Sequence, residues 1–134
     1  MSHSKIVMYV DDAPDLLDIF MQELALKMPE HTCLIFRNPY EALDFLKADN
    51  DLVDLIVTDQ TMPTMSGTDF LLKVVELGYE NDFIVFSGNC DDTVSFNLLK
   101  AELSSKNLSL TARMIEKPNF NLLMDAVKGI LEDV

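Results

Sequence analysis

Leu55-Ile56-Val57-Thr58-Asp59 is the stretch that decides the fold, because an apolar and β-branched run leads directly into a carboxylate. The run ends a strand predicted over residues 52–58, which has apolar residues on both of its faces. A second strand, predicted over residues 83–86, has the same character. Strands of this kind are typical of a parallel sheet that is covered by helices on both sides. The stretch therefore predicts a buried parallel strand with a polar group at its end.

The same strand pattern recurs along the chain, with helical patterns in between. The predicted strands cover residues 5–10, 33–37, 52–58, 83–86 and 112–115. The predicted helices cover residues 14–28, 39–48, 67–77 and 92–104, and in a last helix apolar residues repeat from 122 to 131. Such alternation predicts right-handed βαβ units. The fold class is therefore α/β, with a five-stranded parallel sheet covered on both faces.

Apolar spacing indicates which side of each helix is buried. Pro14 suits the first turn of the first helix, and Asn38-Pro39 suits the cap and first turn of the second. The predicted buried residues are Leu17, Phe20, Met21 and Leu24, then Leu43 and Leu46, then Phe70, Leu71, Val74 and Val75, then Leu98, Leu99 and Leu103, and finally Leu122, Leu123, Ala126, Val127, Ile130 and Leu131. The repeat is least regular in the fourth helix and clearest in the last.

Length and composition restrict the class of protein. A chain of 134 residues has the size of one domain, and we expect residues 1–134 to form a single domain with no output domain attached. Apolar residues make up 49% of the chain, which excludes disorder. The formal net charge of −13 disfavours binding to nucleic acid or to an anionic membrane surface.

Cysteine usage and hydropathy favour a reducing compartment. Cys33 and Cys90 form no C-x-x-C pair and are interpreted as reduced thiols. The first residues carry no signal-peptide core, and no stretch approaches the roughly 18–20 apolar residues that span a bilayer. We therefore expect a cytoplasmic protein without membrane insertion.

Polar residues follow four of the predicted strands, at the edge where a doubly wound sheet binds its ligands. They are Asp11 and Asp12, Asp59, Ser87-Gly88, and Lys117-Pro118. Three converging carboxylates repel one another unless a cation joins them, and oxygen ligands without His or Cys suit Mg²⁺. His3 and His31 lie far from this set in the sequence and are not expected to be ligands.

These residue types together predict an aspartyl-phosphate site. A carboxylate is a competent nucleophile toward phosphorus when positive charge offsets the charge on the transferring oxygens. Mg²⁺ and Lys117 would supply that charge, and the Ser87 hydroxyl would hydrogen-bond another oxygen.

In order and spacing, these motifs resemble the receiver domain of bacterial two-component response regulators. The motifs are the run Ile6-Val7-Met8-Tyr9-Val10-Asp11-Asp12, the run Leu55-Ile56-Val57-Thr58-Asp59-Gln60-Thr61-Met62-Pro63 followed by Met65-Ser66-Gly67, the pair Ser87-Gly88, and Lys117-Pro118. The resemblance covers almost the whole chain, and it implies a flavodoxin-like (βα)5 fold with strand order 2-1-3-4-5 and a cis Lys117–Pro118 bond.

The resemblance also implies a role for each site residue. Asp59 would accept a phosphoryl group from a sensor histidine kinase or a histidine phosphotransfer protein. Asp11, Asp12 and Asp59 would hold Mg²⁺ with the backbone carbonyl of Thr61, while Ser87 and Lys117 would contact the phosphoryl oxygens. The expected function is that of a stand-alone switch of protein–protein contacts, acting on an output protein that the sequence does not name. It would catalyse only its own phosphorylation and dephosphorylation.

Two features depart from the usual pattern. Met114 stands three positions before Lys117, where receivers usually carry an aromatic switch residue. Ser87 and Lys117 are thirty positions apart, with the excess length around residues 103–111, so the fourth helix is either extended or followed by a longer loop. The resemblance also implies that two further positions, Thr61 and Asn89, flank the path of the attacking water. Neither is a carboxylate, which predicts a moderately stable aspartyl-phosphate.

Alternatives remain at the level of residues and of function. Asp11 and Asp12 could cap the first helix, Asp59 could be an ordinary loop carboxylate, Ser87 an ordinary turn serine, and Lys117 a solvated lysine. At the level of function, the chain could be a phosphorylation-independent adaptor, which Met114 favours. It could also be a haloacid-dehalogenase-type phosphatase, although Thr61 stands where those enzymes need a second Asp.

Overall fold

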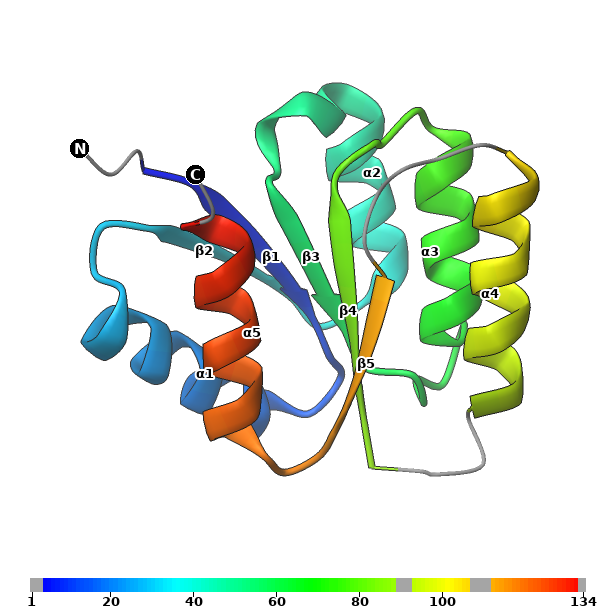
Figure 1. Ribbon diagram of the computed structural model, residues 1–134. Coiled ribbons are helices and arrows are strands. Elements are labelled where there is room, and N and C mark those ends of the chain that lie inside the picture. Colours follow the sequence, from blue (N-terminus) through cyan, green and yellow to red (C-terminus); the bar gives the residue numbers. More distant parts are fainter. Residues whose placement is uncertain (1–3, 89–92, 107–111, 133–134) are drawn as a thin grey trace.

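Five parallel strands form one sheet, with helices on both faces (Figure 1). The computed structural model describes residues 4–88, 93–106 and 112–132. The strands are β1 (Ile6–Val10), β2 (Thr32–Phe36), β3 (Leu55–Thr58), β4 (Asp82–Ser87) and β5 (Ala112–Glu116). The helices are α1 (Pro14–Lys27), α2 (Pro39–Asp49), the short 3₁₀ helix η1 (Asn50–Leu52), α3 (Gly67–Glu76), α4 (Thr93–Ser105) and α5 (Phe120–Leu131).

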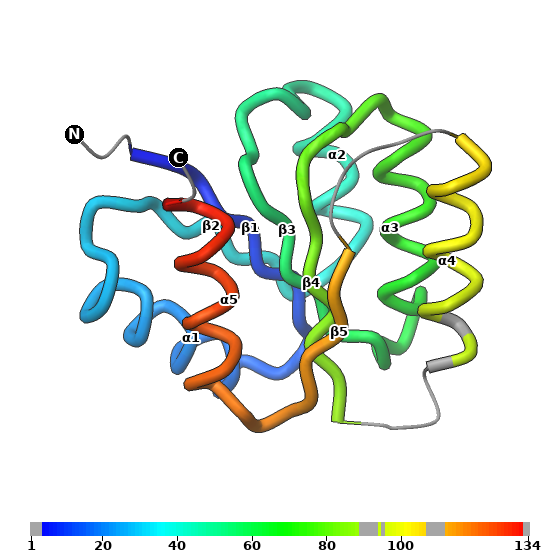
Figure 2. The backbone as a smooth tube through the Cα atoms, viewed as in Figure 1, coloured from blue at the N-terminus to red at the C-terminus, as the bar shows by residue number. Residues whose placement is uncertain are grey.

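The strand order is β2-β1-β3-β4-β5, which confirms the predicted α/β class and the flavodoxin-like order 2-1-3-4-5. Every neighbouring pair is parallel, with Tyr9 of β1 paired to Ile35 of β2 and to Val57 of β3. Figure 1 shows α1 and α5 on one face of the sheet and α2, α3 and α4 on the other. Figure 2 traces the backbone through the same alternation of strands and helices from β1 to α5.

Alternate residues of each strand feed two separate cores. Val7 and Tyr9 of β1 point into the core under α1 and α5, whereas Met8 and Val10 point into the core under α2, α3 and α4. All residues of β3 are buried, as predicted from its two apolar faces. The sheet is therefore a rigid layer whose strand ends can carry a site.

The predicted third strand begins too early. Residue Leu52 belongs to η1 and the strand starts at Leu55, because polar side chains hold the segment in between as a bend. The Asp54 carboxylate accepts the backbone N–H of Ile6 at 2.8 Å, and Asn81 donates to the Val53 carbonyl at 2.9 Å. Smaller differences occur at the ends of the other elements, by one or two residues.

Three residues that were predicted to be buried in the core are exposed in the structure. Met21 is 41% exposed, Leu98 64% and Leu122 44%. Each lies next to a buried helix residue, and one step of about 100° around a helix is enough to turn a side chain out of a flat interface.

The helix caps were easier to predict, since Asn38 accepts from the backbone N–H of Tyr40 at 2.8 Å as its cap role requires.

Among the described residues, no helix combines the length and the apolar character that crossing a membrane would require.

Candidate functional site

Four strand ends bring the predicted site residues to one edge of the sheet, at the bottom of Figure 1. Backbone hydrogen bonds continue the sheet ladder one residue past the strands. Asp11 N–H donates to the Phe36 carbonyl at 3.0 Å, Asp59 N–H to the Val10 carbonyl at 2.9 Å, and Lys117 N–H to the Ser87 carbonyl at 2.9 Å. The backbone that carries these side chains is therefore held by the sheet itself.

Lys117 joins two of the predicted carboxylates. Its Nζ lies 3.0 Å from Asp11 Oδ2 and 3.0 Å from Asp59 Oδ1. The Lys117 side chain is only 15% exposed, and its ammonium lies 5.8 Å from the centre of the Phe86 ring. Asp11 is fully buried and Asp59 is 6% exposed. This ammonium is thus a shared counter-ion in a largely water-excluded setting.

The Asp11 carboxylate has a second buried partner, which sequence reasoning missed. The Tyr9 hydroxyl donates to Asp11 Oδ2 at 2.8 Å, and the backbone N–H of Ala13 donates to Asp11 Oδ1 at 3.0 Å. Tyr9 is fully buried and its ring packs 4.5 Å from that of Phe20. The signal was available, because residues two apart on a strand share a face.

Helix capping does not account for Asp11. The N-cap of α1 is Ala13, and no side chain hydrogen-bonds at that cap. Asp11 instead points toward Lys117 while its other oxygen holds the turn that leads into the helix.

Burial raises the pKa of the Asp59 carboxyl above its ordinary value. The hydrogen bond from Lys117 lowers this pKa, the charge of Asp11 raises it, and a backbone hydrogen bond with Thr61 lowers it. Burial, followed by the nearby Asp11, also raises the pKa of the Tyr9 hydroxyl, which therefore stays protonated and can donate. For Asp59, burial therefore outweighs the stabilisation of the carboxylate by Lys117 and Thr61.

The three aspartates fit a divalent cation. Asp11, Asp12 and Asp59 each offer a carboxylate oxygen, and these oxygens lie within 4.8 Å of one another. With Lys117, the four side chains carry three negative charges and one positive charge, so a divalent ion would neutralise the group. The donor set is all oxygen, which suits a hard ion such as Mg²⁺. Asp12 is exposed and so leaves an approach from solvent.

The remaining predicted residues lie around this group. Ser87 is the last residue of β4 and is 3% exposed, and the neighbouring Gly88 lies against the Lys117 side chain. Thr61 is exposed and lies two residues after Asp59 in the β3–α3 loop. Asn89, the other residue expected near the water path, lies outside the described residues.

The β3–α3 loop is held against Asp59 by contacts that sequence reasoning did not find. A Cβ at Gly67 would collide with the Asp59 carbonyl oxygen and lie 3.0 Å from Gln60 Cα. Thr68 N–H donates to Gln60 Oε1 at 2.9 Å, and Gln60 Nε2 donates to Thr68 Oγ1 at 3.1 Å. The first turn of α3 is thus tied to the residue that follows Asp59.

The family model described as "Response regulator receiver domain" matches residues 7–127. The chain belongs to the response regulator receiver family. Receivers accept a phosphoryl group in two-component signalling and typically bind Mg²⁺ in an acidic pocket. They act as signalling switches rather than as metabolic enzymes.

Solved receiver structures share the fold. This receiver is 23% identical to response regulator TrrA of Thermotoga maritima in complex with Mg²⁺-BeF, with a TM-score of 0.71 over 95% of this chain and 99% of that one. A CheY-like receiver of Methanospirillum hungatei is 24% identical, with a TM-score of 0.72 over 97% and 95%. A chain described as adenylate cyclase of Rhodopirellula baltica is 21% identical, with a TM-score of 0.75 over 96% and 88%. No curated protein sequence matches this receiver.

Three features that the family resemblance implied or questioned can be compared with the structure. The Lys117–Pro118 bond is cis, as expected. Met114 pairs with Val85 and is partly buried against the core under α4, so methionine does fill the apolar gap. Helix α4 ends at Ser105, and the extra residues 107–111 lie outside the described part of the chain.

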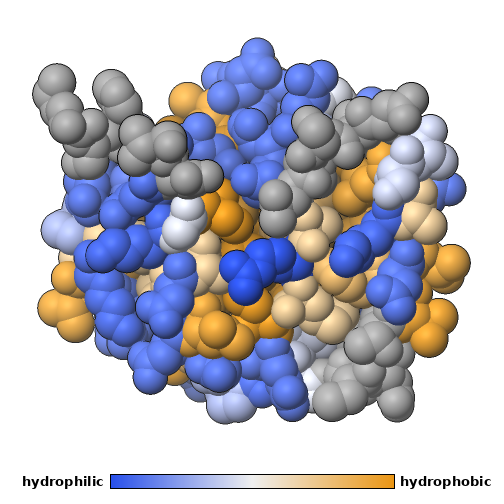
Figure 3. All heavy atoms as spheres, viewed as in Figure 1, coloured by the Kyte–Doolittle hydropathy of each residue, from blue (hydrophilic) through white to orange (hydrophobic). Residues whose placement is uncertain are grey.

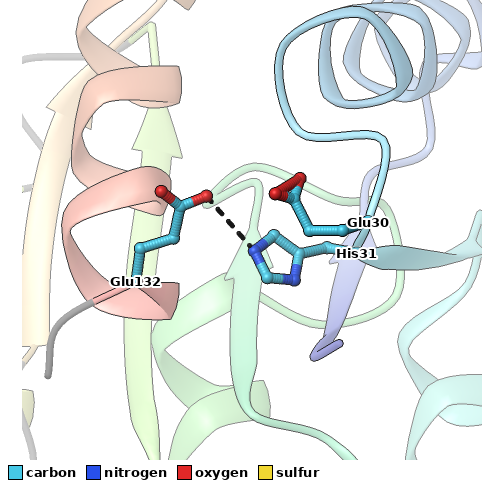
Figure 4. A group of neighbouring side chains, drawn as sticks. All are labelled: Glu30, His31 and Glu132. Atoms are coloured by element: carbon cyan, nitrogen blue, oxygen red, sulfur yellow. Dashed lines mark ion pairs between the residues drawn. The ribbon is translucent and has the colours of Figure 1, made fainter. Parts of the chain in front are cut away.

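A second group of possible metal ligands lies away from the aspartates, at the α1–β2 turn and the end of α5. Figure 4 shows the carboxylates of Glu30 and Glu132 beside the His31 ring. His31 Nδ1 accepts the backbone N–H of Lys5 at 3.0 Å, so the ring proton belongs on Nε2, which lies 3.4 Å from Glu132 Oε2. A metal-bound imidazole instead donates from its other nitrogen. This tautomer supports the prediction that His31 is not a metal ligand. It favours a structural role, in which the His31 side chain links Lys5, just before β1, to Glu132, just after α5.

Proposed function

We propose that this receiver is an Mg²⁺-dependent phosphoryl acceptor that switches protein–protein contacts. Asp59 takes the phosphoryl group from a sensor histidine kinase or a histidine phosphotransfer protein. The observation that carries the proposal is the Lys117 ammonium, which lies 3.0 Å from both Asp11 and Asp59 while all three side chains are mostly buried. Such an arrangement places a nucleophilic carboxylate, that of Asp59, beside a cation that can receive the oxygens of the incoming group.

The reaction needs an ionised Asp59, and Lys117 and Thr61 favour that form. Lys117 opposes the effect of burial on the pKa of Asp59, and bound Mg²⁺ would add positive charge that stabilises the oxygens of the transferring group. An Asp59 carboxylate oxygen bonds to phosphorus while the bond from phosphorus to the donor's histidine nitrogen breaks. Tyr9 and the Ala13 N–H hold Asp11 in place, so Asp11 can serve Lys117 and the metal at once.

The other site residues take supporting roles. Asp11, Asp12 and Asp59 would hold Mg²⁺ together with the Thr61 backbone carbonyl. Lys117 moves from its bridging position to the phosphoryl oxygens, and Ser87, at the end of β4, donates its hydroxyl to another of them. Those two movements would connect the phosphorylated site to the β4–α4 and β5–α5 segments, which is how a local change alters a distant surface.

A phosphorylation-independent adaptor is the second candidate. The observation that favours it is Met114, which packs in the apolar gap without a ring that can change orientation. The two functions differ in one measurable respect. An adaptor binds its partner equally well as wild type, as Asp59→Asn and as phosphorylated protein, whereas a switch does not.

Intact mass tests the proposal directly. Purified receiver is mixed with a small phosphodonor and Mg²⁺, alongside Asp59→Asn and the matched control Asp44→Asn, whose side chain is 79% exposed on α2. We expect wild type and Asp44→Asn to gain one phosphoryl group, and Asp59→Asn to gain none. Chelation of Mg²⁺ should abolish the gain. Equal labelling of all three proteins would contradict the proposal.

A further inference from the structure

Helix α4 has apolar residues on two opposite sides. Phe96, Leu99 and Leu103 are at most 8% exposed and pack into the core. Val94 and Leu98, however, are 67% and 64% exposed on the other side. These two residues are four positions apart and so lie one above the other on the helix. An apolar stripe in water along a helix that is already packed on its inner side is unusual for an isolated domain.

This stripe borders a groove between α3 and α4. The groove encloses about 470 Å³ and is lined by Thr68, Asp69, Leu72, Leu98, Leu99, Ala101, Glu102 and Ser105. Its apolar floor comes from both helices, which lie side by side in Figures 1 and 2. Figure 3 shows apolar side chains at the outer edge of the molecule over α4. The charged residues that line the groove, Asp69 and Glu102, are both acidic.

Both walls of the groove start beside the phosphoacceptor site. Helix α3 follows the loop after Asp59, and Thr68 in its first turn is hydrogen-bonded twice to Gln60. Helix α4 is the next helix after Ser87, the last residue of β4. A change in the positions of these two loops would therefore change how the walls of the groove face each other.

We propose that the α3–α4 groove binds a basic amphipathic helix of the output partner. Apolar side chains of that helix would cover Leu72 and Leu98, and its Lys or Arg residues would face Asp69 and Glu102. Charge carries the choice of partner, since the receiver has a net charge of −13 and the groove is acidic at its rim. The further step, that phosphorylation of Asp59 alters the affinity of the groove, rests on the proposed function.

An NMR titration of the ¹⁵N-labelled full chain tests the docking site. The probe is a synthetic helix of about 18 Leu and Lys residues, long enough to be helical, and the control peptide carries Glu in place of Lys. We expect shift changes centred on Leu72, Leu98 and Glu102. Leu98→Gln should weaken binding about tenfold, as loss of a central apolar contact does. Leu26→Gln is the matched control, because Leu26 is 78% exposed on α1.

Several results would overturn the docking site. Shift changes centred on α1 or α5, equal binding of the acidic peptide, or equal losses in Leu98→Gln and Leu26→Gln would each do so. Concentration-dependent shifts in the same groove without peptide would assign it to a second copy of the chain instead.

A separate experiment tests whether phosphorylation of Asp59 alters the affinity of the groove. The titration is repeated on protein whose phosphorylation has been verified by intact mass, and we expect the affinity to change several-fold. An unchanged affinity on fully phosphorylated protein overturns the link and leaves the docking site standing. If intact mass shows no phosphoryl group, the proposed function fails and the link falls with it, whereas the docking result from unmodified protein is independent of both.

Discussion

At the residue scale, the site is an anionic group that is short of positive charge. Asp11 and Asp59 share one ammonium, while Asp12 adds a third carboxylate whose oxygen lies within 4.8 Å of theirs. Such a group favours binding of a cation. Without a cation, repulsion among the carboxylates lowers the free energy of unfolding, so the arrangement that suits metal binding also destabilises the fold.

The substitution Asp12→Asn should separate the effect of the site on Mg²⁺ binding from its effect on stability. Removal of one negative charge should stabilise the protein without Mg²⁺ by about 0.5–1 kcal/mol, a modest value because Asp12 is exposed. The same change should remove most of the stabilisation by added Mg²⁺. Urea unfolding with and without Mg²⁺ measures both effects, and Asp44→Asn is the control. A variant that is less stable without Mg²⁺ would argue against charge repulsion in the site.

The raised pKa of Asp59 predicts how stability depends on pH. A carboxyl whose pKa is higher in the folded state binds its proton more tightly there, so its ionisation weakens the fold as pH rises from the ordinary value of 3.8 through the raised one. Relative to Asp59→Asn, wild type should therefore lose stability across that window and then level off. Urea midpoints of both proteins from about pH 3.5 to about pH 8 measure the difference. A wild type that gains stability relative to Asp59→Asn as the pH rises through this window would mean that the sign is wrong.

At the element scale, the β3–α3 loop supports the strand end that carries Asp59. The β3–α3 loop passes so close to Asp59 that only glycine fits at residue 67, and Gln60 ties it to α3. At the other end of the sheet, His31 joins the start of β1 to the end of α5.

Gly67→Ala should disturb Asp59 through its backbone. The added Cβ meets the Asp59 carbonyl, and we expect a loss of about 1–3 kcal/mol in stability together with slower phosphorylation. The control is Gly129→Ala in α5, where no atom lies within 4 Å of the new Cβ. That change should stabilise the protein by about 0.5–1 kcal/mol, as alanine does inside a helix. Thermal unfolding measures the stability of both variants, and intact mass over time measures their rates of phosphorylation. A Gly67→Ala variant with wild-type stability and rate would refute the close approach of residue 67 to Asp59.

His31→Ala should remove the link that the His31 side chain makes between the start of β1 and the end of α5. The Lys5 N–H loses its acceptor, and we expect a loss of about 1–3 kcal/mol, against less than about 0.5 kcal/mol for Glu30→Gln on the exposed turn. Urea unfolding gives both values. Stabilisation of wild type by Zn²⁺, absent in His31→Ala, would show that the cluster binds a metal after all.

At the scale of the whole molecule, the fold could be predicted because its signals are local and repeated. Apolar strands with two buried faces alternate with amphipathic helices, and that pattern leads to a parallel sheet covered on both sides. The residues at the strand ends could be predicted for the same reason, since parallel strands bring their ends together. The predicted roles of Asp59, Lys117 and their neighbours remain proposals.

The parts that could not be predicted depend on contacts between segments distant in the sequence. The shared position of Lys117 between Asp11 and Asp59 needs the fold of β1, β3 and β5 together. The exposure of Leu98, and hence the groove beside it, depends on how far α3 and α4 stand apart. Periodicity marks a leucine as apolar but does not say whether a neighbour covers it.

Mapping the phosphorylated residue tests the central claim most directly. Receiver treated with a phosphodonor and Mg²⁺ is reduced with borohydride, which converts an aspartyl-phosphate to homoserine, and the digested chain is sequenced by tandem mass spectrometry. The account predicts homoserine at residue 59, and at no other aspartate, with no conversion when Mg²⁺ is chelated. Homoserine at Asp11 or Asp12, or a phosphate found on a serine or histidine, would contradict it.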